Sequence, residues 1–517
     1  MNRPYKLTAI IAAAVIVLSQ AAAMADTAPY QSYTYDYREN VVMTPAPYLP
    51  ESIISGASLG IGTLSQPRDI TVGGDGRLYI ADTGNNRIVV TDAAMTRAET
   101  IVTEFDNNGL TDKLSAPTGL ALSDTGELYI ADSKNRRIVA LSPDLHSAVK
   151  VFENPVHEAL PSGFVFTPLR VAVDYADRVY VIAQNMFQGI LVFEPDGEFT
   201  GFFGTINVTV TLWQRFWRAI ASKEERANTR LFVPTEFTGL DIDPYGFVYA
   251  SNMDPQGTKA VRRLNPKGED VAIAGISNNL GGDIAVSISG PYSGVSRMVD
   301  VAYQGRGIYS LLDSQRGRIF TYDREGNLLY IFGGLGSQAG TFRSPAAIEY
   351  VTGGGGGGGN GDGSNSGDGS ARLLALDYVR GDITVFAPTM YGALINEAVG
   401  LRFDGDETQA VGKWQEVLRI NENLELANAG IGKAYLTSGD NKTAMRYLKL
   451  GMNRQYYSIA FRRYRNDLLK ANLGWILTAA VVAIGLIVII RAVYRKRNGN
   501  PDGSLSDSSG TGLMGDG

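Results

Sequence analysis

Short segments in which apolar and polar positions alternate fill most of the chain before residue 390, and they recur in register. One unit opens at Pro67 with PRDITVGGDGRLYIADTGNNRIVV, and another opens at Pro117 with PTGLALSDTGELYIADSKNRRIVA. Each unit has an apolar strand, a polar turn with a Gly, the strand LYIAD, a second turn and the strand RIV. The pattern predicts small antiparallel sheets repeated along the chain, and therefore a mainly β fold.

Weaker copies of the unit begin at Pro168, Pro234, Arg297 and Pro345, which gives six units in all. In the first two units the Pro, the turn Gly, the Tyr, the Ala-Asp pair, the Asn and the Arg-Ile pair recur in register. In these positions the unit resembles the NHL repeat. The resemblance implies a six-bladed β-propeller with one four-stranded sheet in each blade.

The sixth unit stops after ITVFAPT, one strand short of the earlier units. The segment from Glu51 to Pro67 has the pattern of the missing strand and precedes the first full unit. Pairing this segment near Ile53 with the strand at Ile383 removes the open sheet edges. We therefore predict a closed six-bladed propeller over residues 40–388.

Polar residues recur in the turns of the first two units, at Asp82, Asn85, Arg87, Asp132, Asn135 and Arg137. They could form a ligand-binding set. Repetition favours the other interpretation, because turn residues recur when they satisfy backbone groups at tight bends. We therefore expect them to be part of the architecture.

After the propeller, residues 394–456 change to a helical pattern with a period of 34. Ala398, Gly405 and Trp414 are matched by Gly432, Gly439 and Leu448, each 34 positions later. This spacing resembles two tetratricopeptide repeats, although the family's usual Pro is replaced by Glu422 and Tyr456. We predict a tetratricopeptide-like helical stalk over residues 394–470. The resemblance implies a concave surface for a protein partner, with Tyr435 as a candidate contact.

Two insertions interrupt the regular blades. Between the third and fourth units, Trp213, Phe216 and Trp217 fall on one face of a predicted helix. This face could pack on the propeller, or it could contact a membrane or a partner groove. The second insertion, Gly353 to Ser370, is a Gly-rich loop without EF-hand or RTX calcium spacing.

Both ends of the chain carry targeting signals. Residues 1–25 have Arg3 and Lys6, an apolar run and an A-x-A pattern before Asp26, which predicts a cleaved signal peptide rather than an uncleaved anchor helix. Residues 473–490 are apolar and long enough to cross a bilayer as a transmembrane helix. Four cations flank each side of this span, so the export signal decides the orientation. We expect a single-pass cell-membrane protein with residues 26–472 outside and a cytoplasmic tail at 491–517.

Composition narrows the chemistry. The 517 residues include 53 Asp and Glu and 47 Lys and Arg, a net charge of −6, without the basic block that a nucleic-acid partner would require. The chain has no Cys and two His, His146 and His157, so thiolate and His-rich metal sites are excluded. Any metal would have oxygen ligands.

The sequence predicts a binding or scaffold protein whose propeller contacts a membrane-embedded or envelope protein, or a glycan. The alternative is a metal-dependent hydrolase resembling gluconolactonases, which implies a divalent cation such as Ca²⁺ near the central axis. Candidate ligands for that cation are Glu236, Asn185, Asn252 and Asp313. No catalytic motif or paired carboxylates stand out, and we expect no bound cofactor.

Overall fold

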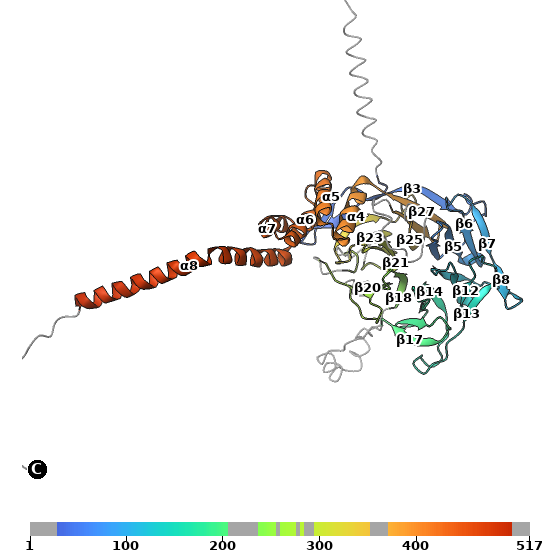
Figure 1. Ribbon diagram of the computed structural model, residues 1–517. Helices are drawn as coiled ribbons and strands as arrows, with labels where there is room; N and C mark the ends of the chain where they lie inside the picture. Colours follow the sequence, from blue (N-terminus) through green and yellow to red (C-terminus); the bar gives the residue numbers. More distant parts are fainter. Residues whose placement is uncertain are drawn as a thin grey trace, which may run out of the picture.

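The computed structural model consists of a ring of sheets, a group of helices beside it and one long helix that extends away (Figure 1). It describes residues 28–204, 236–254, 259–275, 280–283, 294–351 and 371–498. The predicted signal peptide, the insertion with Trp213, Phe216 and Trp217, and the Gly-rich loop lie outside these residues.

Six antiparallel sheets form the blades of the ring. The first three blades, from the innermost strand outward, are β4 (Asp69–Val72), β5 (Leu78–Asp82), β6 (Arg87–Thr91) and β7 (Ala98–Val102); β10 (Pro117–Leu122), β11 (Leu128–Asp132), β12 (Arg137–Leu141) and β13 (Ala148–Phe152); β14 (Pro168–Val173), β15 (Val179–Ala183), β16 (Ile190–Phe193) and β17 (Phe199–Phe203). The last three are β18 (Phe237–Ile242), β19 (Val248–Asn252) and β20 (Val261–Leu264); β21 (Met298–Gly305), β22 (Ile308–Asp313), β23 (Arg318–Tyr322) and β24 (Leu328–Gly333); β25 (Pro345–Val351), β26 (Arg372–Asp377), β27 (Asp382–Pro388) and β3 (Tyr48–Ser55).

The ring is closed. Each innermost strand contacts the innermost strand of the next blade, in the order β4, β10, β14, β18, β21 and β25, and β25 contacts β4 again. The fold is thus the predicted six-bladed β-propeller.

Closure depends on the N-terminal strand, as the sequence predicted. β3 pairs antiparallel with β27, and Ile383 lies opposite Ile54 while Thr384 lies opposite Ile53. The strand begins at Tyr48 and ends at Ser55, so it is shorter than the predicted segment to Pro67, because the chain turns at Gly56.

A hairpin before β3 was not foreseen. β1 (Tyr33–Tyr35) pairs with β24 and with β2 (Val41–Met43), so the fifth blade has six strands. Tyr33 and Tyr35 both donate hydrogen bonds to Asp283, which fixes the hairpin on the blade. A second small hairpin, β8 (Glu104–Asn107) and β9 (Leu110–Lys113), connects the first two blades.

Helices follow β27 directly. They are α4 (Met390–Phe403), α5 (Glu407–Ile420), α6 (Glu425–Ser438), α7 (Asn441–Leu450) and α8 (Arg454–Asn498). Thr389, Asp406 and Asp440 cap α4, α5 and α7 by accepting backbone hydrogen bonds. Gly405 and Gly439 have a φ of +87° and turn the chain between the members of each pair. The four shorter helices form two hairpins, and their assignment as tetratricopeptide repeats stays a prediction.

Candidate binding surfaces and the ring axis

The recurrent turn residues bind one another and the backbone. Asp82 accepts the amide hydrogen of Ser65 (2.7 Å) and also hydrogen bonds from the side chains of Asn85 (2.8 Å) and Arg87 (2.7 Å). Asp132 repeats this arrangement with Ser115, Asn135 and Arg137. Both carboxylates are fully buried, so these contacts tie each second strand to the loop that enters its blade. The geometry supports the architectural interpretation.

The candidate cation ligands of the hydrolase alternative lie in unlike environments. Asn185 is exposed in the loop after β15, and Glu236 is half-buried just before β18. Asn252 and Asp313 are buried at the ends of β19 and β22, the position that Asp82 and Asp132 occupy in their own blades.

Asp313 already accepts backbone hydrogen bonds from Arg297 (2.8 Å) and Gln315 (2.8 Å). Across the described parts of the chain, no three Asp, Glu or His side chains are grouped so that they could hold a metal ion.

The ring axis is lined by two layers of side chains from the innermost strands. Strand register makes the following positions equivalent in the six blades: Asp69, Gly119, Arg170, Gly239, Asp300 and Ala347 in the first layer, and Thr71, Ala121, Ala172, Asp241, Ala302 and Glu349 in the second. In the first layer, charged residues from alternate blades are separated by Gly or Ala. We call Asp69, Arg170, Asp241, Asp300 and Glu349 the axial cluster.

Two positions of the first layer, Gly119 and Gly239, require glycine because the charged residue of the next blade lies directly against them. A Cβ atom on Gly119 would lie 2.8 Å from the Cα of Arg170, and one on Gly239 would lie 2.6 Å from the Cα of Asp300. Both distances are shorter than atomic contact permits, so the two glycines let adjacent innermost strands come together.

Arg170 connects four blades across the axis. Its guanidinium forms an ion pair with Asp69 of the first blade and lies 3.9 Å from a carboxylate oxygen of Asp300 in the fifth. It also donates to the carbonyl of Ala346 in the sixth blade (2.8 Å). One side chain of the third blade thus neutralises acids of two other blades.

The second layer contains two acids, Asp241 and Glu349, and none of its six positions carries a Lys or Arg. Asp241 accepts amide hydrogens from Ile242 (2.7 Å) and Tyr303 (2.5 Å), and Glu349 accepts one from Tyr350 (2.9 Å). Burial raises the pKa of Asp241 to about 7, with nearby Asp243 and Asp69 adding repulsion. Burial also raises the pKa of Glu349 well above its usual range, assisted by the charge of Asp241. The axis therefore holds protons near neutral pH.

Burial likewise raises the pKa of Asp300 to about 7, although Arg170 opposes this effect. Asp300 accepts the amide hydrogen of Ile348 (2.9 Å) and Asp69 accepts that of Leu120 (2.8 Å), each from the next blade along the chain. The axial acids thus bind neighbouring blades to one another.

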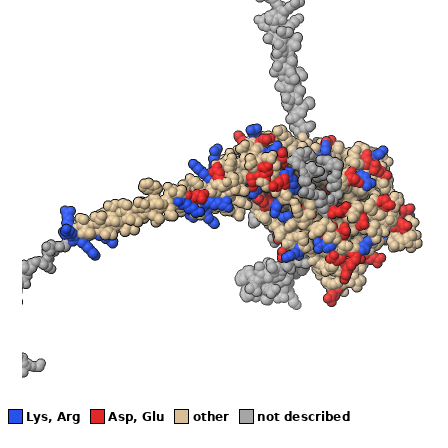
Figure 2. All heavy atoms as spheres, viewed as in Figure 1, with Lys and Arg blue, Asp and Glu red and all other residues tan. Residues whose placement is uncertain are grey.

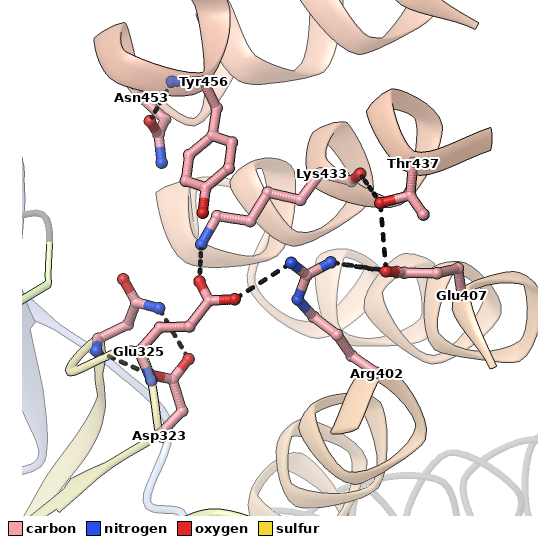
Figure 3. Close-up of polar contacts among 9 residues, drawn as sticks. Asp323, Glu325, Arg402, Glu407, Lys433, Thr437, Asn453 and Tyr456 are labelled. Carbon is pink, nitrogen blue, oxygen red and sulfur yellow. Dashed lines mark hydrogen bonds and ion pairs between the residues drawn. The ribbon is translucent and has the colours of Figure 1, made fainter. Parts of the chain in front are cut away.

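The helices dock on the turns of the fifth blade through an ionic network (Figure 3). Glu325, in the turn between β23 and β24, forms ion pairs with Arg402 of α4 (3.1 Å) and with Lys433 of α6. Burial alone would raise the pKa of Glu325, but Lys433 and Arg402 outweigh it and hold the pKa at about 2. Arg402 continues the network to Glu407 of α5 (2.9 Å).

Apolar packing extends across the same junction. One cluster of buried side chains joins the fifth and sixth blades to α4, α5 and α6, and includes Phe332, Phe386, Ile395 and Trp414. Tyr435, the predicted partner contact, is half-buried and stacks on Tyr447 at 5.8 Å between ring centroids. Its ring is therefore engaged within the helical stalk.

Two exposed tyrosines on the ring were missed by the sequence reasoning. Tyr175 (55 % exposed) and Tyr245 (58 % exposed) lie in the turns between the first and second strands of the third and fourth blades. The corresponding turn of the fifth blade contains Gly307, which faces Phe403 of α4. Because equivalent turns lie on one face of a propeller, both tyrosines share the face on which the stalk docks. Tyr175 stands in the turn DYAD and Tyr245 in the turn DPYG, and an aromatic residue within a polar turn is the signal by which the sequence could have indicated them.

The last helix leaves the body as one continuous element. The first part of α8 packs on α7 around Ala444, Leu448 and Ala460, and Asp467 accepts a hydrogen bond from Asn441 (2.9 Å). Beyond this point α8 is long and apolar enough to cross a membrane, and none of its apolar stretch is buried. Figure 2 shows that this apolar stretch is bounded by Lys and Arg at both ends.

Comparison with known families matches the NHL repeat at residues 64–90 and 114–141. No curated protein matches the chain. Similar solved structures include virginiamycin B lyase from Staphylococcus aureus, with 10 % identity, coverage of 69 % of this chain and 87 % of that chain and a TM-score of 0.35. A streptogramin B lyase has 11 % identity, coverage of 66 % of this chain and 97 % of that chain, and a TM-score of 0.37. Kuenenia stuttgartiensis hydrazine synthase has 11 % identity, coverage of 62 % of this chain and 95 % of that chain, and a TM-score of 0.36. The chain thus carries NHL repeats, and these supply the three inner strands of each of the first two blades of its six-bladed β-propeller.

Proposed function

We propose that the protein is a membrane-anchored scaffold that presents its propeller, outside the cytoplasm, to a protein partner in the same membrane or envelope. The observation that carries this proposal is the continuity of α8. This helix packs against the stalk at its beginning and exposes a span-length apolar surface at its end. In water such a surface would be an aggregation hazard, whereas in a bilayer it is solvated by lipid.

The junction supports a scaffold with a fixed geometry. Glu325 is bonded to two helices at once, and the apolar cluster runs from the blades into the same helices. A rigid junction holds the ring face with Tyr175 and Tyr245 at a constant angle to α8. Exposed tyrosines are enriched where proteins bind one another, because they give contact area at a low entropy cost.

Topology is testable with single cysteines, since the natural chain has none. We would place one at Lys113 in β9 and, separately, one at Ser508 in the tail. A membrane-impermeant maleimide should label Lys113→Cys in intact cells and Ser508→Cys only after permeabilisation. N-terminal sequencing of the mature protein should begin at Asp26. Labelling of the tail alone in intact cells would reverse the proposed orientation.

The partner surface is testable by photo-crosslinking in native membranes. A photoreactive amino acid at Tyr175 or Tyr245 should give a discrete adduct with a membrane or envelope protein. The same residue at Lys134, in a turn on the opposite face of the ring, is the matched control. Adducts of equal yield from both faces, or none from the tyrosine face, would refute this surface.

A further inference from the structure

The chain has a strongly uneven charge distribution. Residues 441–472, which comprise α7 and the first part of α8, contain eight Lys and Arg and one Asp, a net charge of +7. The whole chain has a net charge of −6, which leaves −13 on the remainder. All eight cations are exposed, namely Lys442, Arg446, Lys449, Arg454, Arg462, Arg463, Arg465 and Lys470. We call this set the basic collar.

Among the residues that the structure describes, the basic collar has no acidic partner. No described acidic side chain forms an ion pair with any of its eight cations, whereas several exposed cations of the ring have an acidic partner. Figure 2 shows Lys and Arg gathered where α8 leaves the body, next to the apolar stretch. Holding seven uncompensated charges together is unfavourable unless an external anion offsets their repulsion.

Helix geometry places the part of the collar nearest the span at the membrane surface. Lys470 is three residues before Leu473, the first residue of the predicted span, and is therefore about 4.5 Å from it along the helix axis. Arg462 is eleven residues away, or about 17 Å. The bond between Asn441 and Asp467 places Lys442 between these two levels. Headgroups occupy roughly the first 5–8 Å beyond the hydrocarbon, and the surface potential extends about a further 8 Å, one Debye length.

We propose that the basic collar binds the headgroups of anionic phospholipids in the leaflet on the propeller side of the membrane. The inference rests on the proposed function, since it requires α8 to span a bilayer. Several cations on two packed helices would then hold the stalk at a defined height above the membrane. The negative charge of the ring would simultaneously repel it from the same surface.

Trp475 gives a direct test, because it lies two residues inside the predicted span and next to the collar. The full chain with Trp213→Phe and Trp217→Phe would be reconstituted in vesicles of phosphatidylcholine with phosphatidylglycerol. Either lipid would be brominated in turn, and quenching of Trp475 would report which lipid contacts the collar. The remaining Trp414 is buried in the stalk, so it contributes a constant background.

We expect brominated phosphatidylglycerol to quench severalfold more effectively than brominated phosphatidylcholine, and added salt to reduce the difference. Each cation near an anionic surface contributes about a fivefold preference. Replacement of Lys442, Arg462, Arg465 and Lys470 by Gln removes four such contributions and should therefore abolish most of the difference, so that the two lipids quench nearly equally. Arg463 is left in place because it donates to the carbonyl of Leu436.

A matched control replaces four exposed cations of the ring by Gln, at Lys113, Lys134, Arg136 and Lys267, and should keep the native lipid preference. Equal quenching of the native chain by both lipids would overturn the proposal. A preference that survives the collar substitutions would also overturn it. Absence of quenching by either lipid would place Trp475 outside the bilayer, and would refute the membrane anchor itself.

Discussion

Replacement of Asp241 by Asn tests whether ionisation of a buried carboxyl group at the ring axis lowers the free energy of unfolding. The unfolded carboxyl ionises near pH 3.8, whereas burial raises the pKa of the folded carboxyl to about 7. Between these values the native state keeps a proton that the unfolded state has released. The free energy of unfolding therefore falls as pH rises from about 4 to about 7, and stays low above that.

The size of the effect follows from the two pKa values. Each tenfold difference in proton affinity is worth about 1.4 kcal/mol, so a pKa of about 7 against 3.8 corresponds to about 4 kcal/mol at pH 8. Asn is neutral at every pH and can still accept the amide hydrogen of Tyr303. Asp241→Asn should therefore be more stable than the natural protein at pH 8, by up to about 4 kcal/mol, and equal to it at pH 4.

Chemical denaturation of the detergent-solubilised full chain at both pH values, followed by near-ultraviolet circular dichroism, measures this difference. The exposed Asp196→Asn is the matched control and should leave the pH dependence unchanged. Equal stability of Asp241→Asn and the natural protein at pH 8 would refute the reasoning, because it would mean that the buried carboxylate has no ionisation cost.

Three further predictions concern other contacts of the ring and of the stalk. Arg170→Met should lower the free energy of unfolding by about 3–5 kcal/mol, and by more at pH 8 than at pH 5, because the buried acids lose their cation. Denaturation at the two pH values measures this loss. A loss that does not depend on pH would contradict the prediction. Ile54→Ala should lower the free energy of unfolding by about 2–5 kcal/mol, because Ile54 is 5 % exposed in the closing strand. Ile53 is 41 % exposed, so Ile53→Ala should change the free energy of unfolding by no more than about 0.5 kcal/mol. Equal effects of the two substitutions in thermal unfolding would argue against ring closure by β3. Glu325→Gln should loosen the stalk by about 1 kcal/mol, seen as a broader distance distribution between spin labels on the ring and on α7. Because the pKa of Glu325 is lowered to about 2, the natural protein should show the same broadening only as pH falls from about 4.5 towards 2, and no broadening in either case would contradict the ionic docking.

The blades could be predicted because their signals are local. Alternating apolar positions set the strands, and Pro, Gly and Asp set the turns, so six copies and one missing strand could be counted from residues close in sequence. The apolar run in α8 is a local signal for the same reason. The β1–β2 hairpin was missed because its pairing with β24 spans about 300 residues and leaves no periodic pattern.

The ring axis was decided by tertiary structure alone. Asp69, Arg170, Asp241, Asp300 and Glu349 occupy positions where the repeat is broken, so a search for the repeat does not identify them. Their chemistry arises because ring closure brings five strands to one line, where burial removes water from acids that outnumber the single cation. A residue's pKa depends on those neighbours and on that lost hydration, and neither is encoded within its own repeat.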